Sequence, residues 1–161
     1  MKKILVVLNV FSFLVIVGCA KNYYYRSEKK VVTDENIDIT FHVDTVFISL
    51  TVKNKTNKII KILWDECGFI NHYGNSFRVS PPFVPLTVVY QPKTPTLIAP
   101  NGTDVNTLKT HGITEIVGEK KAKKLIGLTV GLIVTISIDN IKKSFYIETK
   151  IKQVFTPEKL Y

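Results

Sequence analysis

The stretch from Leu125 to Ile138 constrains the fold more than any other part of the chain. It is mainly apolar, but it is shorter than the roughly 20 residues that a membrane-spanning helix needs. Every second residue carries a large apolar side chain: Ile126, Leu128, Val130, Leu132, Val134, Ile136 and Ile138. A helix would scatter these residues around its axis, whereas a strand places them on one face. The stretch therefore predicts a long β-strand with one face in a core.

The same period of two recurs before and after this stretch. The segments that show it are Ile37–Val43, Val46–Val52, Lys58–Trp64, Ser76–Val79 and Lys143–Phe155. Residues that favour turns separate these segments: Asp44-Thr45, residues 54–57, residues 71–75 and Asp139-Asn140. The alternation changes phase at Asp44-Thr45. Asp139-Asn140 predicts a hairpin turn.

Prolines rule out a helix between residues 81 and 100. Thr87–Tyr90 and Thr96–Ala99 fit short strands at sheet edges, and residues 100–103 predict a tight turn into a strand over Asp104–Leu108. Thr114 could cap a short helix over residues 115–124, although Gly118 weakens that expectation.

About eight to ten short strands with turns between them predict an all-β fold, an antiparallel β-sandwich of the immunoglobulin-like type. Trp64, on the third predicted strand, fits the core tryptophan of such domains. No cysteine pair supports the assignment, and a Greek-key barrel is the alternative.

The first 18 residues have the pattern of a secretion signal. Lys2 and Lys3 supply a positive start, Ile4–Val17 is apolar apart from Asn9 and Ser12, and the small residue Gly18 follows. The apolar run is too short to span a bilayer comfortably, so a cleaved signal is favoured over an uncleaved anchor.

Ile16-Val17-Gly18-Cys19 resembles the lipobox of bacterial lipoproteins. The resemblance implies cleavage between Gly18 and Cys19, and a diacylglycerol on the Cys19 thiol with further fatty acylation in many bacteria. Two or three acyl chains anchor a protein stably, whereas one binds only marginally. By analogy with enterobacteria, Ala20 permits delivery to the outer membrane, on its periplasmic face, where the cell has two membranes.

We expect residues 1–18 to be the signal peptide, 19–35 the lipidated N-terminus and a tether, and 36–161 the β-sandwich domain. The tyrosines at positions 23–25 fit the membrane interface, where amphipathic rings are favoured. Equally, they could pack on the domain or begin a strand.

A second resemblance covers roughly residues 45–105. Its elements are the runs 47–58, 60–65, 74–79 and 98–103. These are similar to small uncharacterised lipoproteins with immunoglobulin-like domains. That family implies a fold but no activity, and it contributes no catalytic residues.

The sequence offers little catalytic chemistry. His42 and Asp44 share a strand face, but no further ligand stands at metal spacing, so we expect no metal site. Cys67 follows Asp65 and Glu66, whose charges raise a thiol pKa, so a structural thiol is favoured over a disulfide to a partner chain. No phosphate-binding loop or nucleophile elbow is present, and we expect no cofactor.

The chain has a formal net charge of +9. Such a balance permits contact with anionic partners, although solubility explains it as well. The lysines at 120, 121, 123 and 124 fit either a solvated face or a contact with an anionic surface. Arg26 and Arg78 are the only arginines, which disfavours nucleic-acid recognition.

These features predict a lipid-anchored envelope protein without enzymatic activity, which acts as a binding or structural module for a protein partner. One alternative is an envelope hydrolase, which would need a pocket that gathers Asp65, Glu66, His72 or His111. Another is a periplasmic carrier of lipid or another ligand, which would need a large internal cavity.

Overall fold

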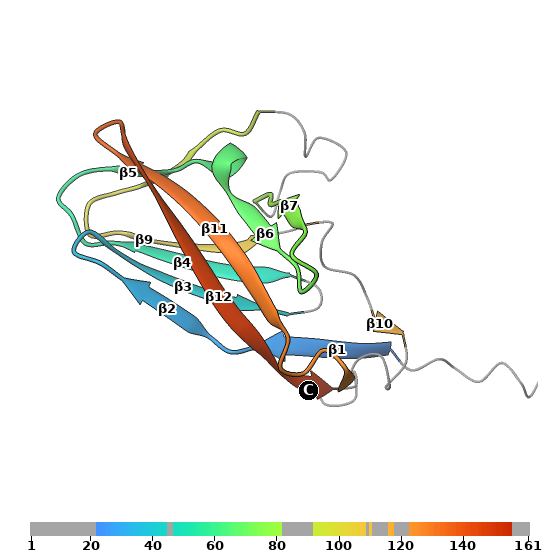
Figure 1. The fold of residues 1–161 in the computed structure, drawn as a ribbon. Coiled ribbons are helices and arrows are strands. Elements are labelled where there is room, and N and C mark those ends of the chain that lie inside the picture. The colour runs from blue at the N-terminus through green and yellow to red at the C-terminus, as the bar shows by residue number, and fades with distance from the viewer. Residues whose placement is uncertain are drawn as a thin grey trace, which may run out of the picture.

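The computed structural model describes residues 22–44, 47–81, 92–108, 110, 116–117 and 123–155. They form an all-β sandwich of two antiparallel sheets packed face to face (Figure 1). The first sheet has the order β2 (Lys30–Thr33), β3 (Ile37–Val43), β4 (Ile48–Asn54) and β9 (Thr103–Leu108). The predicted fold class is confirmed.

The second sheet has β11 at its centre. Its order is β10 (Ile116–Val117), β1 (Asn22–Ser27), β12 (Ile141–Phe155), β11 (Thr129–Ile138), β5 (Ile60–Ile62) and β8 (Thr96–Ile98). β6 (Gly68–Ile70) also pairs with β11 and continues to β7 (Ser76–Arg78). A 3-10 turn, η1 (Trp64–Glu66), joins β5 to β6.

The chain crosses between the sheets in the immunoglobulin-like manner. In that fold strands A, B and E share one sheet, and strands C, F and G share the other. Here β3, β4 and β9 pair in the first sheet, while β5, β11 and β12 pair in the second. An isolated bridge between Arg26 of β1 and Asp44, which follows β3, joins the two sheets.

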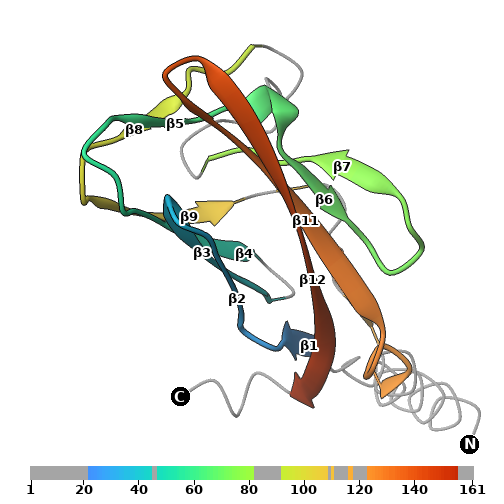
Figure 2. The same ribbon diagram turned by 60° about the vertical axis from the view of Figure 1, so that its left-hand side comes forward.

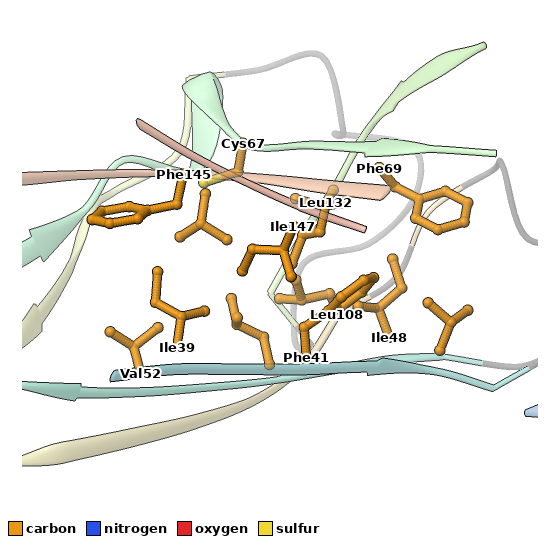
Figure 3. Close-up of a cluster of buried hydrophobic side chains, with 14 of the residues drawn as sticks. Ile39, Phe41, Ile48, Val52, Cys67, Phe69, Leu108, Leu132, Phe145 and Ile147 are labelled. Atoms are coloured by element: carbon orange, nitrogen blue, oxygen red, sulfur yellow. The ribbon is translucent and has the colours of Figure 1, made fainter. Parts of the chain in front are cut away.

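Alternation of side chains explains the core. In β3 every second residue, from Ile37 to Val43, is buried. Figure 3 shows Phe41 and Leu108 of the first sheet directed toward Leu132 and Ile147 of the second. These side chains belong to one contiguous buried cluster, so the two sheets share a single core.

The hairpin turn predicted at Asp139-Asn140 is confirmed. Both residues have positive φ, 49° and 66°, and Ile138 pairs with Ile141 across the turn. Positive φ at both central residues is the requirement of a type I′ turn, whose twist matches that of the flanking strands. β8 is also confirmed as an edge strand, whereas residues 87–90 lie outside the described residues.

Trp64 is buried, as predicted, but it begins η1 instead of ending a strand. Its indole N–H donates to Thr96 Oγ1 at 2.8 Å, which satisfies the polar end of the ring. The side chain thereby links η1 to β8.

The structure corrects three details of the sequence interpretation. Residues 22–33, expected within a tether, form β1 and β2, and Tyr25 is buried. Ile116–Val117, expected in a helix, form β10, while residues 118–122 lie outside the described residues. Ile126 and Leu128 precede β11 and are exposed. In the first two cases pairing with a distant strand, which local periodicity does not report, decided the outcome.

Candidate functional site

The end of the sandwich that carries the β11–β12 turn also carries the β2–β3 turn and the β4–β5 connection, and we call it the turn end (Figures 1 and 2). A hollow of about 330 Å³ opens there. Its lining consists of Asn36, Thr56, Asn57, Lys58, Ile138, Asp139, Ile141 and Lys143. Residues from three separate connections therefore meet at one concave surface, which makes it a candidate binding site.

Asp34 fixes the β2–β3 turn beside this hollow. Its Oδ1 accepts the N–H groups of Asn36 at 2.7 Å and Ile37 at 2.8 Å, and its Oδ2 accepts Lys143 Nζ. Partial burial alone would raise the pKa of Asp34, but these hydrogen bonds outweigh it, so the pKa lies below its usual value. The Asp34 carboxylate is thus charged, and both of its oxygens accept hydrogen bonds that stabilise the β2–β3 turn.

Asn54 fixes the β4–β5 connection. Its side chain is fully buried, and Nδ2 donates to the carbonyls of Lys58 at 2.7 Å and Ala99 at 2.9 Å. Its Oδ1 accepts the N–H of Thr56 at 2.9 Å. Since a buried amide is costly to leave unpaired, these bonds hold the connection rigidly. The amide serves the turn, in agreement with the interpretation of Asn54-Lys55-Thr56 as turn residues.

The charges in the turn-end hollow neutralise one another. Lys58 pairs with Asp139, and Lys143 pairs with Asp34. The aliphatic side chain of Ile141 is 75% exposed beside them. The turn-end hollow therefore combines an exposed aliphatic group with a polar rim of paired charges.

A second hollow, of about 240 Å³, lies beside η1 on the outer face of the second sheet. It is lined by Asp65, Glu66, Cys67, Gly68, Ser76, Phe77, Arg78 and Ile133. The two carboxylates that the hydrolase alternative requires are therefore adjacent here. His72, however, lies in the β6–β7 turn against Tyr73, with 3.9 Å between ring centroids, and His111 lies outside the described residues.

Cys67 is held as a structural thiol. It is 5% exposed, and its Sγ donates to the carbonyl of Leu63 at 3.3 Å. Burial is the main reason that the pKa of the Cys67 thiol rises from 9.0 to about 11, and the charges of Glu66 and Asp65 act in the same direction. The sequence predicted the direction from the carboxylates, whereas burial is the larger cause. Because the Cys67 thiol is buried, it is poorly placed to form a disulfide with a partner chain.

The Cys67 thiol is expected to resist alkylation in the folded protein. In a Cys19→Ser variant it is the single cysteine, and iodoacetamide at pH 8 should label it at least tenfold more slowly than after urea unfolding, since the thiolate is the nucleophile. Because the pKa of this thiol is higher in the folded state, the folded protein favours the protonated thiol. The contribution of the protonated thiol to folding stability is therefore fully present below pH 9 and is lost as the pH rises toward 11. Equal labelling rates in folded and unfolded protein would contradict the assignment.

Lys93 is a residue that the sequence analysis did not single out. Its side chain is 3% exposed, and its Nζ lies 3.7 Å from Asp65 Oδ1. Among the described residues no acceptor lies within hydrogen-bond distance of this ammonium. Its burial beside Asp65 depends on packing around η1, which residue type alone does not reveal.

His42 lies beside Asp44 at the end of β3. Its Nε2 lies 3.9 Å from Asp44 Oδ2, and Arg26 Nε donates to the other carboxylate oxygen at 3.0 Å. Within the part of the chain that the structure describes, no three potential ligands gather. The Arg26–Asp44 pair instead links β1 to the end of β3.

Gly18 and Cys19 lie outside the described residues. The described residues begin at Asn22, the first residue of β1, which pairs with Val117 of β10. β1 lies at the end of the sandwich opposite to the β11–β12 turn (Figures 1 and 2). In the described ranges, no helix has the length and apolar character that crossing a membrane requires.

Comparison with protein-family models, curated proteins and solved structures found no match to this chain. The strand order gives the fold, an immunoglobulin-like β-sandwich.

Proposed function

We propose that this protein is a lipoprotein of the bacterial cell envelope, anchored through lipid on Cys19, which presents the turn end of its sandwich to a protein partner. The observation that supports it most is the placement of β1 and the turn-end hollow at opposite ends of the domain. The chain enters at β1, three residues after Cys19, while the turn-end hollow lies at the opposite end. An anchor at Cys19 would hold one end near the bilayer and leave the other accessible.

The composition of the turn end supports a protein as the partner. Its surface combines the exposed Ile141 with amide and hydroxyl groups and internally paired charges. Such a surface can bury an aliphatic centre without leaving a charge unpaired. The hydrogen bonds of Asn54 and the type I′ turn hold the surface loops in place before binding. Less conformational entropy is then lost when a partner binds to these loops.

The hydrolase alternative has less support. Glu66 pairs with Lys142, Asp65 accepts the backbone N–H of Lys93 at 3.0 Å, and the Cys67 thiol stays protonated at neutral pH. These groups are committed to packing around η1, so we favour a module without enzymatic activity.

The carrier alternative has less support for a different reason. The faces of both sheets meet in large, fully buried side chains, among them Phe41, Phe69 and Leu132. Apolar side chains that fill the space between the sheets leave little room for a lipid.

A photocrosslinking amino acid introduced in living cells tests the partner. At position 57, in the turn-end hollow, it should yield a discrete adduct of higher mass. At position 73, an exposed residue of the β6–β7 turn, it should not. No adduct at position 57, or equal adducts at both positions, would overturn the assignment of the turn end.

A further inference from the structure

The segment Lys123–Leu128, which we call the proximal loop, exposes two aliphatic side chains in front of β11. Ile126 is 50% exposed and Leu128 is 37% exposed. Leu125, which precedes them, is buried in the core. Single exposed aliphatic residues are common on soluble proteins. Two of them on one short loop form a local apolar tip and call for an explanation.

Backbone hydrogen bonds tie the proximal loop to β12. The N–H of Gly127 donates to the carbonyl of Ile151 at 2.8 Å, and the N–H of Ile151 donates to the carbonyl of Leu128 at 3.0 Å. Gly127 has a φ of 88°, a conformation that L side chains rarely adopt. The backbone thus fixes Ile126 and Leu128 outward, and they do not fold back onto the core.

The proximal loop lies at the end of the sandwich where the chain enters. Its hydrogen-bond partner Ile151 pairs with Ser27 of β1, so the loop and β1 flank the same part of β12. Figures 1 and 2 both show the start of β11 beside β1, away from the β11–β12 turn. Two residues separate Asn22 from Cys19, and the three Cα–Cα steps between them span at most about 11 Å.

Exposed lysines lie on the proximal loop and beside it. Lys123 and Lys124 are exposed on the loop itself, and Lys150, paired in register with Thr129, is exposed beside it. The nearby carboxylate of Glu28 is neutralised by Lys30 and Lys152. Aliphatic side chains flanked by lysines are typical of surfaces that lie in the interface of an anionic membrane.

We propose that the proximal loop docks onto an anionic lipid bilayer, with Ile126 and Leu128 inserted at the boundary between headgroups and acyl chains. This inference rests on the proposed anchor, because that anchor holds the loop next to the lipid. It goes beyond the anchor by fixing the orientation of the domain. The lysines contact phosphate groups, and the turn end points away from the bilayer.

Quenching of tryptophan by brominated lipid tests this orientation. Ile126→Trp and Ile141→Trp are made in the full lipidated chain and reconstituted into vesicles of phosphatidylethanolamine and phosphatidylglycerol with brominated acyl chains. Trp64, the single native tryptophan, is buried and gives both variants the same background. Position 141 is the matched control, an exposed isoleucine at the opposite end.

We expect Ile126→Trp to be quenched several-fold more strongly than Ile141→Trp, and to lose much of this quenching in phosphatidylcholine vesicles, which carry no net charge. Equal quenching at both positions, with both variants folded by circular dichroism, would overturn the inference. If the chain floats with vesicles but position 126 is unquenched, the inference fails and the anchor stands. If the chain does not float with vesicles, the anchor fails as well.

Discussion

Cells that produce the Cys19→Ser variant are expected to incorporate no fatty acid into this protein and to stop its cleavage after Gly18. The serine hydroxyl is a far poorer nucleophile than a thiolate and cannot accept the thioether-linked diacylglycerol. Without two or three acyl chains, each contributing about 0.8 kcal/mol per buried methylene, attachment to the bilayer becomes marginal. Metabolic labelling with a fatty-acid analogue, followed by fractionation, measures both effects.

Cys67→Ser is the matched control, because it removes the other cysteine of the chain. Cys67 is buried in the folded domain, so its loss should leave labelling and fractionation unchanged. Mass spectrometry of the unsubstituted protein should identify Cys19, modified, as the first residue. Unchanged processing and unchanged sedimentation of the Cys19→Ser variant would remove the basis of the proposed function.

The Phe41→Ala substitution is expected to lower the free energy of unfolding by about 3–5 kcal/mol, the usual cost of removing a buried phenyl ring. Phe41 is fully buried in β3 and lies between the two sheets (Figure 3). A loss of that size is a large fraction of the stability of a typical domain. Urea denaturation in the Cys19→Ser background, followed by Trp64 fluorescence, measures it.

Tyr73→Ala provides the comparison for an exposed aromatic residue. Tyr73 is 77% exposed in the β6–β7 turn, so its removal should change the free energy of unfolding by less than about 1 kcal/mol. Comparable losses for Phe41→Ala and Tyr73→Ala would mean that the contact between the sheets contributes little to stability.

The turns that form the candidate site could be predicted from the sequence, but their meeting at one end of the sandwich could not. Asp139-Asn140 and residues 54–57 were correctly expected to form turns, because their chemistry favours positive φ or hydrogen bonds to neighbouring backbone. Asn36, Lys58 and Ile141 meet only because β2–β3, β4–β5 and β11–β12 end at the same edge of the sandwich. Lys93 was missed because its burial depends on packing around η1.

The sequence by itself determined which residues of β3 and β11 face the core. Side chains alternate along a strand by local geometry, so Ile37 to Val43 and Val130 to Ile136 could be assigned without knowledge of their neighbours. Only the tertiary structure decided which strands pair. β1 and β2 show no clear alternation, and backbone hydrogen bonds to β12 and β3 recruit them into the sheets. Those bonds join residues far apart in the chain and carry no signature in residue type.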